Sequence, residues 1–206
     1  MGLRFRIIAL VALLMGCAGH CYSQNYVKLN GVYALCGIIN PQVEFRISPH
    51  STVQTEVVYS PWQSVKGHPM HFGITMSEYR YYIKESNSGF YIGANAGMMA
   101  FKLSKPEFAN GKIRFQNRYC KGWGYMLGLC VGYEYRFADR WLLDVFFGYS
   151  FMESRYNGYS LEGEIDMYPH RPDWKQPPHP DPFNGSAEWL PNKAGLSIGI
   201  LINRPR

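Results

Sequence analysis

Long hydrophobic runs are absent from the chain beyond its first residues. No later stretch reaches the roughly 18 apolar residues of a membrane-spanning helix, so we expect no transmembrane helix. A strong charge imbalance is also absent, with 21 Lys and Arg against 15 Asp and Glu. Without residues 1–23, which include Arg4 and Arg6, the formal net charge falls from +6 to +4. This mild excess gives no argument for binding nucleic acid.

Cysteine is scarce, with five residues in 206. If residues 1–23 are removed, Cys36, Cys120 and Cys130 remain, and an odd number excludes a complete disulfide framework. Cys130 is most simply a small buried residue. A disulfide between Cys36 and Cys120 stays open as an alternative, because both are expected near the same rim of the fold.

The first 23 residues are organised as a secretory signal. Two basic residues precede an apolar core, Ile7 to Met15, and small residues follow. The core is about half of the ~20 residues that span a bilayer. We expect cleavage after Ser23, which leaves residues 24–206 as one domain. The alternative is a lipobox at residues 14–17 that leaves a lipidated Cys17, although Met15 is unusual within such a motif.

Aromatic residues and glycine are abundant, at 16% and 21 residues. They are most ordered in a stretch from Gly122 to Tyr159, on both sides of a short break at residues 138–140. One parity of this stretch is apolar and aromatic, and the other carries glycine and charge. Successive side chains of a strand point to opposite faces. The stretch therefore predicts a hairpin with lipid on one side and a polar barrel lumen on the other.

The same alternation predicts eight strands in residues 24–206. They are expected at Tyr26–Cys36, Gln42–Ile47, Thr52–Ser60, Met70–Lys84, Phe90–Phe101, the two halves of Gly122–Tyr159, and Lys193–Asn203. Long loops, about 102–121 and 160–192, alternate with short turns, as in outer-membrane barrels. The sequence thus predicts an all-β protein, an eight-stranded antiparallel up-and-down transmembrane β-barrel. We expect it in the outer membrane of a Gram-negative bacterium, with both termini in the periplasm.

The inward parity of these strands carries five acidic and five basic residues. They are Lys28, Glu44, Arg46, Glu56, Glu78, Arg80, Glu134, Arg136, Asp144 and Lys193. An eight-stranded barrel is only wide enough for side chains to fill, and buried charges must be paired. We therefore predict a filled polar lumen closed by a salt-bridge plug. Gly124, Gly128 and Gly132 would leave room for long Arg and Glu side chains. A proton or ion path is the alternative.

Aromatic residues are expected to form two belts at the membrane interfaces. The belt near the short turns would contain Tyr81, Tyr82, Phe90, Tyr135, Phe137 and Trp141. The belt near the long loops would contain Tyr33, Tyr59, Trp62, Phe72, Trp123, Tyr125 and Phe151.

The two long loops are candidate contact surfaces. Loop 102–121 is basic, and we expect Lys112, Arg114, Arg118 and Lys121 to contact lipopolysaccharide phosphates. Loop 160–192 is rich in proline and carries Trp174, Phe183 and Trp189 as aromatic anchors for a partner. A disordered spacer or a lid over the barrel mouth is the alternative for this second loop.

Catalytic and metal-binding patterns are weak. No spacing selects a Ser-His-acid set from His68, His71, Ser60, Ser64 and Ser77. A metal could be approached by His170, Asp173, His179 and Asp181, but prolines stiffen that run against convergence. We therefore expect no catalytic residues, no cofactor and no metal. A lipid-A-modifying enzyme and a small pore remain the alternative functions.

Four stretches together resemble a known family. They are GWGYMLGLCVGYEYRFADRWLLDVFFGYSF from Gly122, YSPW from Tyr59, SEYRYY from Ser77 and KAGLSIGILI from Lys193. The chain resembles an uncharacterised outer-membrane barrel family, domain of unknown function 3575, similar in architecture to small OmpA- and OmpX-like barrels. The resemblance implies no catalytic residues. It implies a role at the cell surface with an extracellular or surface-fibre partner, because relatives occur beside surface-fibre genes.

Overall fold

The computed structural model describes residues 24–62, 67–104, 106–109, 112–115, 118–161 and 184–203. Its strands are β1 (Asn25–Asn30), β2 (Pro41–Ser48), β3 (Ser51–Ser60), β4 (Met70–Tyr82), β5 (Gly89–Leu103), β6 (Pro106–Ala109), β7 (Lys112–Phe115), β8 (Arg118–Arg136), β9 (Trp141–Ser160) and β10 (Asn184–Asn203). One short helix, α2 (Gly31–Leu35), follows β1. Within these ranges, no helix is long and apolar enough to cross a membrane.

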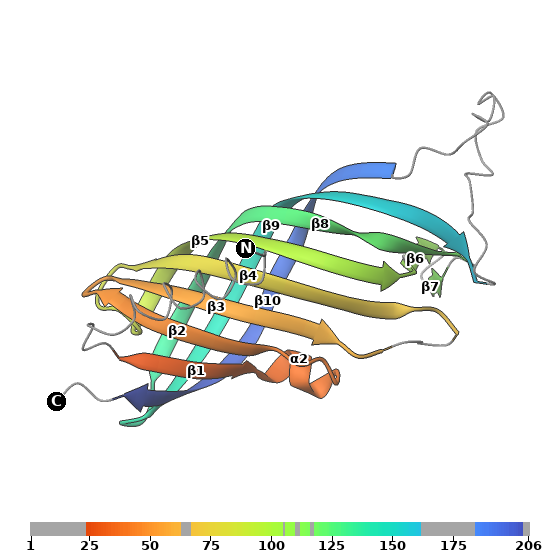
Figure 1. Cartoon of the computed structure of the whole chain (residues 1–206). Helices are drawn as coiled ribbons and strands as arrows, with labels where there is room; N and C mark the ends of the chain where they lie inside the picture. The colour runs from red at the N-terminus through yellow and green to blue at the C-terminus, as the bar shows by residue number, and fades with distance from the viewer. Residues whose placement is uncertain are drawn as a thin grey trace, which may run out of the picture.

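Eight of the strands form one closed sheet, with the order β1-β10-β9-β8-β5-β4-β3-β2. The ring closes because β1 pairs with β2 along one edge and with β10 along the other, and every pairing is antiparallel. This confirms the all-β, eight-stranded, up-and-down part of the prediction. Figure 1 shows short connections at one end of the ring, and α2 with the β6-β7 hairpin at the other. These are called the turn end and the loop end below.

Burial alternates along the strands as the sequence predicted, and the β8-β9 hairpin shows this most clearly. Glu134 pairs with Asp144 across the two strands, and both side chains are buried inside the ring. The neighbouring pair, Tyr133 and Val145, lies outside and is exposed. At this height of the ring the inner face is polar and the outer face is apolar.

Inward glycines of β8 make room for neighbouring side chains, but not for those expected. A Cβ at Gly132 would lie 2.4 Å from the ring of Tyr91, and one at Gly128 would lie 1.8 Å from Ser150 Oγ. A Cβ at Gly124 would meet the Glu153 carbonyl at 2.7 Å. The space thus serves Tyr91 of β5 and the β9 chain, which are adjacent strands, rather than long Arg and Glu side chains from facing strands.

The predicted first strand is wrong beyond Asn30, where the chain turns into α2. Asn30 caps this helix, because its Oδ1 accepts hydrogen bonds from the Val32 and Tyr33 amides at 3.0 and 3.3 Å. The helix end is covered by Trp62, whose Nε1 donates to the Cys36 carbonyl at 2.9 Å. The cap from Asn30 and the contact from the distant Trp62 therefore stabilise a helix where the alternation predicted a strand.

Both predicted long loops are shorter than expected. Loop 102–121 instead contains the end of β5, the two-stranded β6-β7 sheet and the start of β8. Loop 160–192 ends before Asn184, because β10 begins at that residue and pairs with β9 up to Tyr156. Pro191 is accommodated at a register shift between Pro191 and Lys193, which is where a strand tolerates proline.

Candidate functional site

The interior of the ring is the most organised polar site in the described residues. Eight of the ten predicted inward charges gather there with buried side chains. They are Lys28, Glu44, Glu56, Glu78, Arg80, Glu134, Asp144 and Lys193. These eight are called the charge plug below. They come from β1, β2, β3, β4, β8, β9 and β10, so that nearly every side of the ring contributes.

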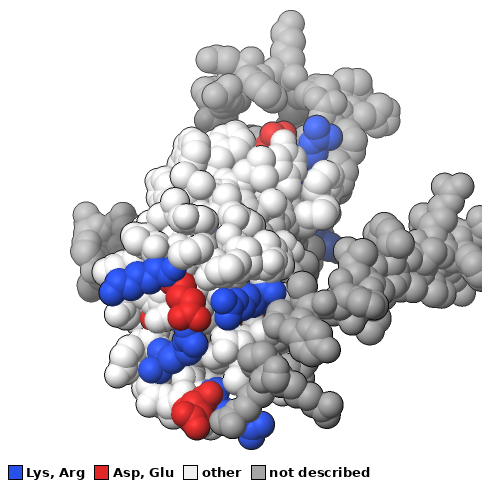
Figure 2. All heavy atoms as spheres, turned by 90° about the vertical axis from the view of Figure 1, so that its left-hand side faces the viewer, with Lys and Arg blue, Asp and Glu red and all other residues white. Residues whose placement is uncertain are grey.

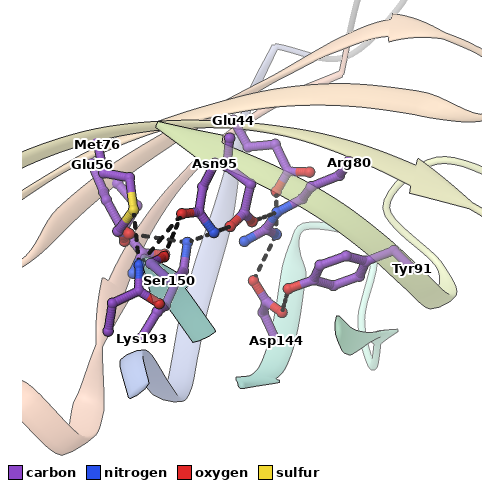
Figure 3. A network of polar contacts seen from close by, with 12 residues as sticks. Glu44, Glu56, Met76, Arg80, Tyr91, Asn95, Asp144, Ser150 and Lys193 are labelled. Atoms are coloured by element: carbon purple, nitrogen blue, oxygen red, sulfur yellow. Dashed lines mark hydrogen bonds and ion pairs between the residues drawn. The ribbon is translucent and has the colours of Figure 1, made fainter. Parts of the chain in front are cut away.

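Lys28 and Arg80 are the two cations at the centre of the charge plug. Lys28 Nζ contacts Glu44 and Glu134, and lies 3.0 Å from Asp144 Oδ2. Arg80 Nη1 lies 2.8 Å from Asp144, 2.9 Å from Glu134 and 3.4 Å from Glu44. Both cations therefore share one set of three carboxylates. Figure 3 shows Arg80 between Glu44 and Asp144.

A second group within the charge plug surrounds Lys193. Its Nζ lies 3.0 Å from Glu56 and 3.2 Å from Glu78. Arg80 joins the two groups, because its Nε lies 2.6 Å from Glu78 Oε1. The plug is thus one continuous network of five carboxylates and three cations.

Hydroxyl and aromatic groups complete the plug, and sequence reasoning missed them. The Tyr82 hydroxyl donates to Glu44 at 2.8 Å, and the Tyr91 hydroxyl donates to Asp144 at 2.9 Å. Thr52 also donates to Glu44. The guanidinium of Arg80 lies over the Tyr91 ring at 4.4 Å. Parity could have found Tyr82, which is two residues from Arg80 on the same strand face.

Tyr82 and Phe72 were placed in the outer aromatic belts, and this assignment is wrong. Tyr82 is fully buried in the plug, and Phe72 lines a cavity inside the ring. Both have the inward parity of β4, because side chains two residues apart share one face.

Arg46 and Arg136 do not join the charge plug, which corrects their predicted place. Each faces Glu85 at the turn end, at 3.8 and 3.5 Å, and all three side chains are partly exposed. Arg136 also donates to the Asn87 carbonyl at 3.1 Å. Both arginines lie near strand ends, so their side chains are at the rim of the ring rather than in its interior.

The predicted contact residues of the loop end are only partly placed. Lys112 and Arg114 lie on β7, and Arg118 and Lys121 lie near the start of β8. Trp189 is a residue of β10, where it stacks on Tyr149 at 6.0 Å between ring centroids. It therefore belongs to the outer wall rather than to a loop. Trp174 and Phe183 lie outside the described residues.

The residues considered for catalysis make hydrogen bonds to neighbouring groups where they are described. Ser60 donates to the Met70 carbonyl at 2.7 Å, and Ser77 pairs with Thr55 at 3.2 Å. His71 contacts the Tyr59 hydroxyl at 3.1 Å. Among the described residues, no group of His, Cys, Asp and Glu could hold a metal ion. Ser64, His170, Asp173, His179 and Asp181 lie outside them.

The three cysteines of the described chain form no disulfide bonds. Cys36 is exposed, Cys120 is partly buried and Cys130 is buried. The alternative of a disulfide between Cys36 and Cys120 is therefore not realised.

Together the fold and the interior define a closed antiparallel ring of eight strands with a buried ionic network inside it. A family model described as "Protein of unknown function (DUF3575)" matches residues 7–175. The chain therefore belongs to this family. No curated protein and no solved structure matches the chain.

Proposed function

We propose that residues 24–206 form a β-barrel of the Gram-negative outer membrane, exported by a signal peptide at residues 1–23. The observation that carries this proposal is the outer wall, which is apolar around the ring. Leu129, Ile92, Phe147 and Ile198 are 69%, 60%, 53% and 47% exposed there. Soluble monomers rarely expose contiguous apolar patches beyond a few hundred Å². Lipid is the solvent that suits such a wall.

The distribution of charge supports the same membrane placement. Exposed charged residues of the turn end include Lys84, Glu85, Asp139 and Arg140. In Figure 2 charged side chains gather over part of the face seen from that end, with a broad uncharged surface beside them. Exposed aromatics also occur near both ends, for example Phe137 and Trp141 at the turn end and Trp62 and Trp123 at the loop end. Charged rims and aromatic belts flanking an apolar band are typical of outer-membrane barrels.

The role that we propose for this barrel is non-catalytic: it is structural and presents its loop end to partners outside the cell. The charge plug supports this role, because buried ion pairs close the lumen toward the turn end and leave the loop end as the accessible surface. Lys112, Arg114, Arg118 and Lys121 would contact lipopolysaccharide phosphates. The segment with Trp174 and Phe183 would engage an extracellular or surface-fibre protein. Neither nucleic acid nor a cofactor has a role in this proposal.

Fractionation tests the membrane placement. We expect the protein in the outer-membrane fraction, with faster gel mobility before boiling than after it. Recovery in the soluble periplasmic fraction would refute the proposal. Mass spectrometry of the mature protein should find Gln24 at its N-terminus, and a lipidated Cys17 would show the alternative processing.

Two measurements separate the proposed role from the alternatives. Lipid A from cells with and without the gene should have the same mass, and a change in acyl number would instead indicate a lipid-A-modifying enzyme. Planar bilayers with the purified protein should show no regular conductance steps, because the charge plug occupies the lumen. Regular steps would indicate a small pore.

The partner contact is tested by replacing residues 162–183 with a short Gly-Ser linker. The exchange spares β9 and β10, which end and begin at Ser160 and Asn184. We expect the variant to assemble with unchanged heat-modifiable mobility. Cells that carry it should show the same surface phenotype as cells that lack the gene. Failure of the barrel to assemble would show that the segment has a structural role. A variant without any phenotype would refute the partner hypothesis.

A further inference from the structure

A cavity of about 290 Å³ lies inside the ring, toward the loop end from the charge plug. Inward-facing residues of β4, β5, β8, β9 and β10 line it, and most are apolar. They include Phe72, Ile74, Met99, Met126, Met152 and Leu190. The lumen is therefore divided along its axis, with ionic contacts toward the turn end and an apolar chamber toward the loop end.

Asn192 lies where the two parts of the lumen meet, and its amide is poorly satisfied. Its Nδ2 lies 3.4 Å from Asn95 Oδ1, and its other neighbours are the sulfur atoms of Met76 and Met126 at 3.6 and 3.8 Å. Among the described residues, none donates a hydrogen bond to its buried Oδ1. Figure 3 shows Asn95, Met76 and Ser150 converging on this part of the lumen. A buried acceptor without a donor is costly, so a donor from a ligand would be stabilised here.

We propose that this chamber binds a single-chain amphiphile with a terminal hydroxyl group. The polar terminus would donate to Asn192 Oδ1, and the hydrocarbon chain would lie along the apolar wall. The volume of about 290 Å³ is just below the usual range for small-molecule sites, which suits one slender chain rather than a whole two-chain lipid. Methionine side chains, which are unbranched and adaptable, fit the variable path of such a chain. The site goes beyond the non-catalytic surface role and does not depend on it.

The experiment titrates n-octanol into the protein with ¹³C-labelled methionine methyl groups, observed by NMR in phospholipid nanodiscs. Met99, Met126 and Met152 line the chamber, whereas Met98 is 63% exposed on the outer wall. We expect saturable shifts of the three chamber methyls and no saturable shift of Met98. Equal, unsaturated shifts of all four would show simple partitioning into lipid and would overturn the proposal. If the chain proves soluble, the same titration in buffer keeps this result separate from the membrane proposal.

Matched ligands and variants test the two parts of the site. Methyl heptyl ether lacks a donor and should bind about fivefold more weakly than n-octanol, as expected for one lost hydrogen bond. Asn192→Leu should erase this preference. Ile74→Trp should fill the chamber and weaken binding at least tenfold, while Ile92→Trp, at an exposed position of the outer wall, should leave it unchanged. Equal binding of alcohol and ether by the unaltered protein, or full binding by a folded Ile74→Trp variant, would contradict the proposal.

Discussion

Single residues hold the charge plug together, and Arg80 contacts more of its carboxylates than either lysine does. It is fully buried, contacts Glu44, Glu78, Glu134 and Asp144, and joins the two groups of the charge plug. Five carboxylates already face only three cations, so removal of one cation increases this excess of buried acid. The plug should therefore depend on Arg80 more than on any arginine at the rim.

The first prediction compares Arg80→Ala with Arg46→Ala. Arg80→Ala should lower the free energy of unfolding by about 3–5 kcal/mol, the typical cost of breaking a buried ion pair. Arg46→Ala should cost about 0–1 kcal/mol, because its pair with Glu85 is partly exposed. Urea unfolding followed by heat-modifiable mobility measures both. Coincident midpoints would contradict a plug that stabilises the barrel.

A second prediction concerns the glycines and compares Gly132→Ala with Gly73→Ala. The added Cβ at position 132 would collide with the Tyr91 ring at 2.4 Å, whereas at position 73 it would meet no atom within 4 Å. Gly132→Ala should destabilise by about 1–3 kcal/mol, the usual cost of overpacking. Gly73→Ala should be neutral or slightly stabilising, because alanine loses less backbone entropy on folding. Unfolding midpoints shifted equally by both variants would exclude this steric account.

At the scale of elements, period-two alternation predicted the strands well, and it failed where a local or distant contact decided the outcome. The residues of α2 alternate well enough to be read as strand. The Asn30 cap and the cover from Trp62 make them helical, and a strand pattern contains neither signal. Parity also gives the face of a side chain but not its depth along the barrel axis. Arg46 and Arg136 were therefore assigned to the interior although they lie at the rim.

The loop-end elements were harder to predict for the same reason. Pro191 interrupts the pattern and indicated a loop, but the register shift that accommodates it depends on pairing with Tyr149 of β9. The apolar chamber was missed as well, because it requires side chains from five strands to be aligned at one height. Strand stagger sets that height, and a single sequence does not reveal it.

The third prediction tests the cap of α2. Asn30→Ala should destabilise by about 0.5–2 kcal/mol, the usual cost of a lost helix cap. It should also increase amide hydrogen exchange in residues 31–38. Asn30→Ser keeps a capping oxygen and should have a smaller effect on both measurements. If Asn30→Ala leaves exchange in this segment unchanged, the cap does not hold the helix.

At the scale of the whole molecule, the medium around the outer wall determines how much a charged side chain on that wall lowers the free energy of unfolding. Leu129→Lys and Ile83→Lys replace residues of similar exposure, 69% and 70%. Leu129 lies in the middle of β8, and Ile83 follows the end of β4 at the turn end. The two positions would be nearly equivalent in water, but they differ in depth if the wall lies in a bilayer.

The fourth prediction follows from this difference in depth. In lipid, Leu129→Lys should cost about 2–4 kcal/mol, and Ile83→Lys about 0–1 kcal/mol near the interface. Unfolding of both variants in lipid vesicles provides the comparison. If both variants unfold with free energies within about 0.5 kcal/mol of the unaltered protein, the two positions behave as an ordinary water-exposed surface. Such a result would argue against membrane insertion.

The unequal lengths of the strands have a consequence for the order in which the ring is assembled. β1 has 6 residues, and β10, which it must meet to close the ring, has 20 and lies at the opposite end of the described chain. Joining segments so distant in sequence is entropically costly and slow, so closure should come late. Lys28 of β1 then meets carboxylates of β2, β8 and β9. This lysine fastens β1 to carboxylates across the ring, and without it the pairing between the first and last strands should open more readily.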